Sequence, residues 1–110
     1  EYADAKTLLS NEIPFAIASD YNPGSSPSGN MNFILSLACN KLKLTTEQAI
    51  NAATINGAYA MGLSHKTGSI TKGKIANVVI TSEIESINDL SYFYGDNLVD
   101  KILINGEEII

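Results

Sequence analysis

Basic residues are scarce in this sequence of 110 amino acids: seven Lys and Arg stand against twelve Asp and Glu, which gives a net charge of -5. Binding to a phosphate backbone depends on positive charge, so the composition excludes a nucleic-acid partner. Apolar runs are also short, well below the roughly 20 residues that span a bilayer. The first residues show no basic segment followed by an apolar one, as a signal peptide would. We therefore expect neither nucleic acid nor a membrane as a partner, and a cytoplasmic location.

Histidine and cysteine are each present only once, as His65 and Cys39. A single cysteine cannot form a disulfide within the chain, and its apolar neighbours indicate a buried, unreactive thiol. A zinc site needs three or four clustered ligands, and a Ser-His-Asp triad needs a histidine beside its nucleophile. We therefore expect His65 in a solvated loop, and neither a complete metal site nor a triad within this chain.

The remaining composition, 45% hydrophobic and 17% charged, is typical of a globular unit or of a piece of one. The chain begins without Met and with residues suited to a helix, which predicts a segment of a longer protein. A helix over residues 1–12 should end at Asn11, and residues 14–20 predict a short strand that is buried on both faces in a parallel sheet. Met31–Leu42 predicts a largely buried helix. Helix, strand, loop and helix in this order indicate an α/β fold.

The second half of the chain changes from helix to strand. A helix is expected from Thr45 to Gly62, because Thr45 and Gln48 have the spacing of a capping box and Gly62 is a typical helix stop. One side of this helix carries small residues, which are Ala49, Ala52, Ala53, Gly57, Ala58 and Ala60. Such a surface buries little area per residue, so we expect a large neighbouring element to pack against it. Residues 68–83 predict strands with a turn, and Asn105-Gly106 predicts a hairpin.

Asp20 ends the apolar run of residues 14–20, at the edge where parallel sheets place their functional groups. Its carboxylate could bind a cation, act as a general base or cap the following turn. In the loop that follows, Pro23 and Pro27 restrict the backbone, and the hydroxyls of Ser25 and Ser26 could face an anionic ligand. There is no GxGxxG and no P-loop lysine, so nucleotide binding is not expected.

The stretch "ASDYNPGSSPSGNM" closely resembles the segment after the eighth barrel strand of the imidazolonepropionases, which belong to the metal-dependent amidohydrolase superfamily. "TTEQAINAATINGAYAMGL" resembles the next helix of the superfamily. "GSITKGKIANVVI" resembles its signature at the entry to a small β-sandwich, with Asn77 as a turn residue where most members carry Asp. The resemblance implies the last βα unit and the C-terminal helices of a TIM-type (β/α)8 barrel in residues 1–66. Residues 67–110 would be C-terminal strands of a composite β-sandwich domain.

The same resemblance implies a site. Asp20 would be a metal ligand for Zn2+ or an Fe ion and a catalytic carboxylate beside the attacking water, with the other ligands on earlier strands outside this chain. Asn22 and Gly24 would contact the formimidoyl-glutamate portion of the product, and Ser25 the substrate. The implied reaction opens the ring of 4-imidazolone-5-propanoate to N-formimidoyl-L-glutamate in histidine degradation. The implied partners are a small-molecule substrate, the rest of the parent chain and further copies in a homo-oligomer. The chain alone is expected to be inactive.

Two alternatives remain open at this point. Another cyclic-amidase or deaminase of the superfamily would share the barrel and the signature but not the substrate. A free-standing module would bind a small ligand or a partner protein through residues 21–29 and catalyse nothing. A substrate profile separates the first alternative, and a pair of metal-binding histidines upstream of residue 1 would exclude the second.

Overall fold

The computed structural model describes residues 2–110 of the chain. Its first helix, α1 (Ala5–Ser10), begins at Asp4, whose carboxylate accepts hydrogen bonds from the hydroxyl and the backbone N–H of Thr7, at 2.7 and 3.0 Å. These bonds favour the ionised carboxylate and lower the pKa of Asp4. The helix ends at Asn11, as the sequence predicts.

Residues 14–20 pair with no strand among residues 2–110, so the predicted β-strand is not formed there. The segment is attached to the helices instead: the N–H of Ile17 donates to the carbonyl of Ala52 at 3.2 Å, and the amide of Asn56 donates to the carbonyl of Phe15 at 2.9 Å. A strand exists only when a neighbouring strand pairs with it, and none lies beside this segment among residues 2–110. The predicted burial on both faces is also not observed, because Phe15 and Ile17 are half-buried against the core while Ala16, Ala18 and Asp20 are exposed.

The second helix, α2 (Met31–Lys41), follows the predicted range closely. It begins at Asn30, whose side chain accepts from two backbone N–H groups of the first turn, at 3.0 and 3.2 Å. Leu35 and Ala38 are buried, whereas Asn40 and Lys41 are exposed. The helix is therefore covered on one side, which is less burial than its apolar composition predicts.

The next predicted helix is two helices, α3 (Thr46–Ala53) and α4 (Ile55–Ala60). The expected capping box is present: Thr45 accepts from the N–H of Gln48 at 3.2 Å, and the side chain of Gln48 accepts from the N–H of Thr45 at 3.0 Å. The break falls at Thr54, with φ -113° and ψ -86°. Its hydroxyl donates to the carbonyl of Ile50 at 2.7 Å, and this local bond competes with a continuous helix.

Helix α4 ends at Ala60, and Gly62, with φ of 70°, provides the predicted stop just beyond it. The N–H of Gly62 donates to the carbonyl of Tyr59 at 2.9 Å, and the N–H of Leu63 donates to the carbonyl of Ala58 at 2.8 Å, which is a Schellman motif. The small-residue side of α3 and α4 faces inward in part, with Ala49, Ala52 and Ala58 buried.

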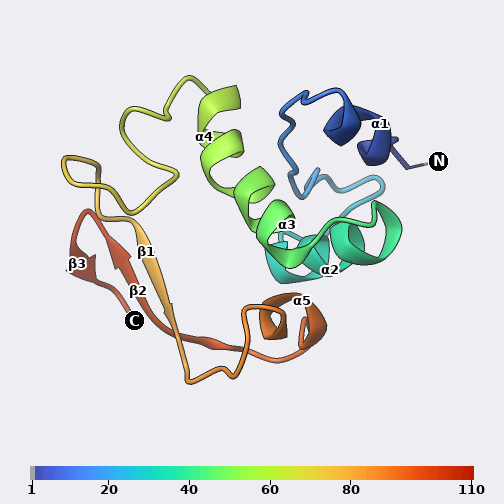
Figure 1. The fold of residues 1–110 in the computed structure, drawn as a ribbon. Coiled ribbons are helices and arrows are strands. Elements are labelled where there is room, and N and C mark those ends of the chain that lie inside the picture. The colour runs from blue at the N-terminus through green and yellow to red at the C-terminus, as the bar shows by residue number, and fades with distance from the viewer. Residues whose placement is uncertain (1) are drawn as a thin grey trace.

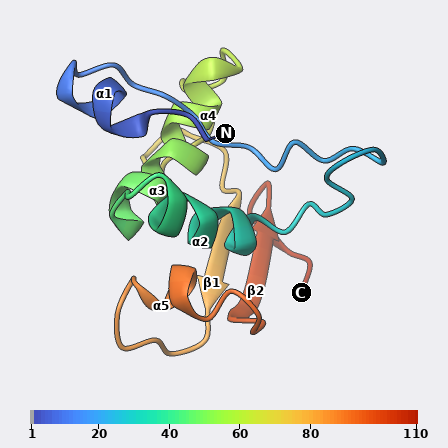
Figure 2. The ribbon, with the colours of Figure 1, turned by 90° about the vertical axis from the view of Figure 1, so that its right-hand side faces the viewer.

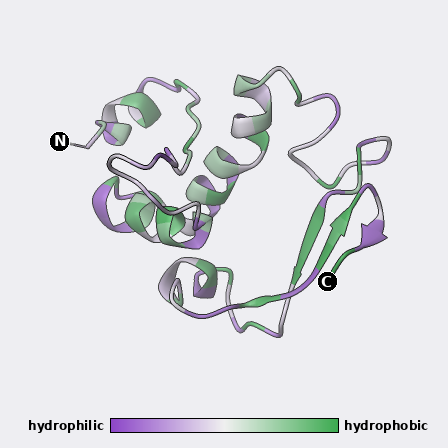
Figure 3. Ribbon diagram, turned by 180° about the vertical axis from the view of Figure 1, so that it is seen from behind, coloured by the Kyte–Doolittle hydropathy of each residue, from purple (hydrophilic) through white to green (hydrophobic). Residues whose placement is uncertain are grey.

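The hydrophobic core is small and lies between α1, α2 and α3. Its buried members are Ala5, Leu35, Ala38, Leu44 and Ala49. No large side chain in the described part of the chain is fully buried, and on α4 Tyr59 is 74% exposed. Figure 3 shows hydrophobic residues along both longer strands of the sheet, where Val79 and Ile80 are exposed. Much of the apolar surface of α4 and of the sheet is therefore exposed to solvent.

The sheet has three antiparallel strands in the order β1 (Val78–Thr81), β2 (Val99–Ile104) and β3 (Glu107–Glu108). Figure 1 shows it beside the helices. The predicted hairpin is confirmed: Asn105 and Gly106 join β2 to β3 with φ of 54° and 83°, the backbone of a type I′ turn. Residues 68–77 contain turns and no strand, so β1 is the only strand formed in the segment predicted to hold several.

Asn77 lies at this hairpin. Its side-chain oxygen accepts from the N–H of Asn105 at 2.9 Å, and the N–H of Gly106 donates to the carbonyl of Ala76 at 3.0 Å. Asp would offer the same acceptor oxygen. The contact gives Asn77 the turn role that the sequence predicts for it.

A short helix, α5 (Asp89–Tyr92), lies between β1 and β2 in the chain and packs against α2. The hydroxyls of Thr46 and Ser91 lie 3.0 Å apart in a buried contact, and the rings of Phe33 and Tyr94 are 5.7 Å apart. The segment 67–110 is thus joined to the preceding helices through α5. None of the helices within residues 2–110 has the length and hydrophobicity that a membrane span requires.

Candidate functional site

Asp20 lies at the end of a segment whose side chains alternate between two sides. Phe15 and Ile17 pack against the hydrophobic core, whereas Ala16, Ala18 and Asp20 are exposed. Figure 2 shows the chain after this segment projecting away from the helices before it returns to α2. The packing of the inward side chains therefore directs the Asp20 carboxylate to the outside.

The backbone of Asp20 is left-handed, with φ of 50°. Residues other than glycine rarely adopt this conformation, which costs about 1–2 kcal/mol, although Asp tolerates it better than most. The carboxylate makes no hydrogen bond with any residue that the structure describes. Of the three predicted roles, capping of the following turn is therefore not observed for Asp20.

Asn22 caps the turn instead. Its side-chain oxygen accepts from the N–H groups of Gly24 and Ser25, at 2.9 and 2.8 Å, and its amide nitrogen donates to the carbonyl of Asp20 at 2.6 Å. This arrangement is an Asx turn, which the Asn-Pro-Gly sequence could have indicated. A Cβ atom at Gly24 would lie 3.3 Å from the same side-chain oxygen, so the turn has little room for a larger residue.

Ser26 closes the loop. Its backbone pairs with Asn22 in both directions, with N···O distances of 2.9 and 3.3 Å. Its half-buried hydroxyl donates to the carbonyl of Ser19 at 3.0 Å. The Ser26 hydroxyl is therefore committed to the protein rather than presented to an anion. The hydroxyl of Ser25 is exposed and lies 3.3 Å from the side-chain oxygen of Asn22.

The four residues predicted to form a site thus lie in one loop, and three of them meet at the side-chain oxygen of Asn22. The sequence did not indicate Ser26 as the residue that holds the loop closed. His65 is exposed after α4, and Cys39 is half-buried, with its sulfur 3.9 Å from the Thr46 hydroxyl. Neither residue belongs to the loop.

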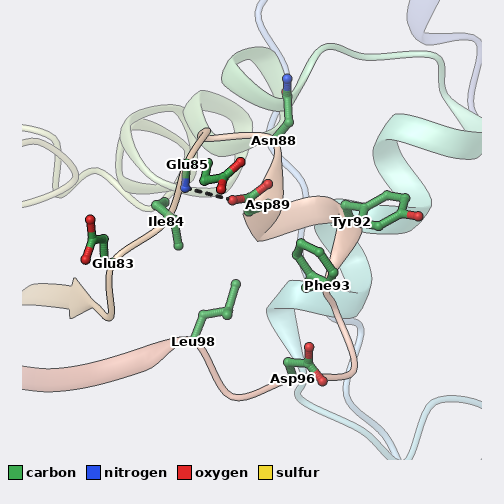
Figure 4. A pocket seen from close by; sticks show the side chains of 9 residues that line it. All are labelled: Glu83, Ile84, Glu85, Asn88, Asp89, Tyr92, Phe93, Asp96 and Leu98. Carbon is green, nitrogen blue, oxygen red and sulfur yellow. Dashed lines mark hydrogen bonds between the residues drawn. The ribbon is translucent and has the colours of Figure 1, made fainter.

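Hollows also occur away from this loop, and two of them lie beside helices. Figure 4 shows the first, beside α5, with the hydrogen bond that Asp89 accepts from the N–H of Glu85 at 3.1 Å. The N–H of Ser86 donates to the same carboxylate at 3.3 Å. Those bonds fix the start of α5, so the carboxylate of Asp89 has a structural role. The second hollow lies between residues 14–16 and α4. None of the predicted site residues lines either hollow.

Comparison with known proteins identifies the family. A family model described as "Amidohydrolase family" matches residues 1–109. The chain belongs to the amidohydrolase family. It is 59% identical over 108 residues to an imidazolonepropionase of Christiangramia forsetii, and 56% identical over 108 residues to one of Flavobacterium johnsoniae. An imidazolonepropionase of Alkaliphilus metalliredigens is 41% identical over 110 residues.

These matches cover nearly all of this chain and a small part of each relative. The first two cover 98% of the chain and 26% of the relative, and the third covers 100% and 26%. The chain therefore spans about a quarter of the length of the curated amidohydrolases that it matches. The resemblance to imidazolonepropionases, which the sequence indicated through residues 18–31, is confirmed.

Amidohydrolases are metal-dependent. The Asp20 side chain has the properties of one ligand in such a metal site. Its exposed carboxylate has no protein partner within residues 2–110, so both oxygens are available as hard donors. In the same part of the chain no three His, Cys, Asp or Glu side chains lie close enough together to hold a metal ion. The residues present fit a single ligand of an amidohydrolase metal site and not a complete one.

Proposed function

We propose that this chain is the C-terminal part of an imidazolonepropionase-type hydrolase. The full-length protein would open the ring of 4-imidazolone-5-propanoate with water and release N-formimidoyl-L-glutamate, a step of histidine degradation. The observation that carries the proposal is 59% identity to an imidazolonepropionase across 98% of this chain. Because the match spans 26% of that relative, the activity belongs to the full-length protein, and the chain alone would be inactive.

In this proposal residues 1–66 form the last βα unit and the C-terminal helices of a TIM-type barrel, and residues 67–110 supply strands of a β-sandwich. The uncovered apolar surface supports this view, since exposed patches of this kind mark places where further protein packs. Tyr59 on α4 is 74% exposed, and Met61, directly after this helix, is 67% exposed. A homo-oligomer is part of the same proposal and rests on the resemblance.

The reaction adds water to the ring carbonyl, breaks the ring C–N bond and transfers a proton to the departing nitrogen. A Zn2+ or Fe ion, held by Asp20 and by ligands outside this chain, would lower the pKa of the attacking water towards neutrality. Asp20 would serve as one ligand and accept the proton of the attacking water. Its outward, unpartnered carboxylate supports both roles.

The neighbouring loop would orient the substrate. The Asn22 side chain donates one of its two N–H groups to the Asp20 carbonyl, which leaves the second for the formimidoyl-glutamate portion of the product. Gly24 would approach the same portion through its backbone. The exposed hydroxyl of Ser25 would bind the substrate. These groups recognise a polar ring without adding charge beside the metal.

The test uses the full-length protein that contains this chain, with N-formimidoyl-L-glutamate measured by mass spectrometry. Asp20→Asn should lower kcat about a hundredfold or more, the scale of acid-base catalysis. Asp100→Asn, on an exposed position of β2, is the matched control and should leave kcat unchanged. Near-normal turnover by Asp20→Asn would contradict the role of Asp20. Hydrolysis of another cyclic amide, with none of this substrate, would favour a different amidohydrolase.

A further inference from the structure

We infer that Ser26 is a positioning residue for Asp20: its hydroxyl holds the backbone on the N-terminal side of Asp20, so that the carboxylate keeps a fixed direction. The inference rests on the proposed function and extends it to a residue that touches neither substrate nor metal. It is carried by the hydrogen bonds around the left-handed backbone of Asp20.

The peptide groups on both sides of Asp20 are held by side chains. The carbonyl of Ser19 accepts from the Ser26 hydroxyl at 3.0 Å, and the carbonyl of Asp20 accepts from the Asn22 amide at 2.6 Å. The N–H of Tyr21 donates to the Ser19 hydroxyl at 3.3 Å. The carboxylate itself has no partner within residues 2–110. The loop therefore fixes the backbone and leaves the functional group free.

Among these contacts, the Ser26 hydroxyl spans the greatest distance along the chain. It joins residues seven positions apart, whereas the bonds of Asn22 and Tyr21 join residues two positions apart. The two-way backbone pairing of Ser26 with Asn22 places its hydroxyl against the Ser19 carbonyl. Ser26 and Ser19 are also half-buried, so water competes less for this bond than for the exposed ones.

Loss of this bond should change the direction of the carboxylate. A left-handed aspartate persists only where its surroundings hold it there, and the backbone would otherwise return to negative φ. Such a change turns the Cα–Cβ bond away from its present direction. Small errors of position in a reacting group have large kinetic effects, of about a hundredfold for a displacement of roughly 1 Å.

The experiment compares Ser26→Ala, Ser26→Thr and Ser28→Ala in the full-length, metal-loaded protein. Ser26→Ala should lower kcat about tenfold, leave KM within about twofold and accelerate metal loss to a chelator about fivefold or more. Ser26→Thr keeps the hydroxyl and should restore both rates. Ser28→Ala is the matched control, because the exposed Ser28 hydroxyl accepts from the N–H of Asn30 at 3.2 Å and makes no other hydrogen bond within residues 2–110. It should behave like the parent protein.

Two results would overturn the inference. In one, Ser26→Ala keeps both kcat and metal retention within twofold of the parent. In the other, Ser26→Ala and Ser26→Thr lose activity together with a fall in melting temperature, which would indicate a general structural role. If the parent protein does not hydrolyse 4-imidazolone-5-propanoate at all, the proposed function fails. The rate of metal release still decides the role of Ser26 in that case, since it requires no substrate.

Discussion

Gly68 is the position where the structure predicts the largest effect of adding one carbon atom. A Cβ atom there would lie 2.6 Å from the Cβ of Ala58, and 3.1 Å from both the Cα of Ile55 and the carbonyl oxygen of Thr54. The last two neighbours are backbone atoms, which cannot rotate away. Gly68→Ala should therefore destabilise the contact between the turn after α4 and the helix itself.

A comparison with Gly73 separates the two causes of this destabilisation, which are the positive φ and the close contact of the added Cβ atom. Both glycines have φ of 91°, but a Cβ atom at Gly73 would meet nothing within 4 Å. The unfavourable backbone costs about 1–3 kcal/mol at either position. Overpacking adds about 1–3 kcal/mol at Gly68 only. The difference in unfolding free energy between Gly68→Ala and Gly73→Ala should therefore be about 1–3 kcal/mol.

Urea unfolding of the two variants in the full-length protein measures this difference. A shared slope with a lower midpoint for Gly68→Ala would indicate a change in stability alone. Equal midpoints for the two variants would refute the reasoning, because the close contact with Ala58 would then contribute nothing. A lower midpoint for Gly73→Ala would refute it more strongly.

Two further predictions concern long-range hydrogen bonds. Asn77→Ala should lower the free energy of unfolding by about 0.5–1.5 kcal/mol, because it loses the bond to the N–H of Asn105. Asn77→Asp keeps the acceptor oxygen and should lower the free energy of unfolding by less. Urea midpoints measure both variants, and an equal loss of stability in the two would contradict the turn role. Thr46→Val and Ser91→Ala should be non-additive in a double-mutant cycle by about 0.5 kcal/mol or more, because their buried hydroxyls lie 3.0 Å apart. Strict additivity would mean that the contact does not couple α3 to α5.

Features decided by neighbouring residues were predictable from the sequence. The capping box of Thr45 and Gln48 and the turn at Asn105-Gly106 depend on side chains and backbone preferences within a few positions. Their structures agree with the predictions. The break at Thr54 is also local. However, a threonine hydroxyl within a helix either points to solvent or bonds to the carbonyl four residues earlier, and the sequence does not indicate which of these is adopted.

Features that depend on distant parts of the chain were not predictable. The strand expected at residues 14–20 required a partner, and the structure joins this segment to α3 and α4 instead. In the loop, the sequence placed Asp20, Asn22, Gly24 and Ser25 together because they are adjacent. It could not show that the Ser26 hydroxyl reaches back to Ser19, since that contact depends on how the loop closes.

The alternating segment before Asp20 has a consequence for amide hydrogen exchange. The N–H of Ile17 is bonded to Ala52, whereas the N–H groups of Ala16 and Ala18 find no acceptor within residues 2–110. Without a further strand beside this segment, those two amides should exchange with deuterium rapidly, while that of Ile17 is slower. If another strand pairs along the edge opposite Ala52, Ala16 and Ala18 become protected without any change at Ile17. Two alanine amides thus report whether the edge that leads to Asp20 is open or covered.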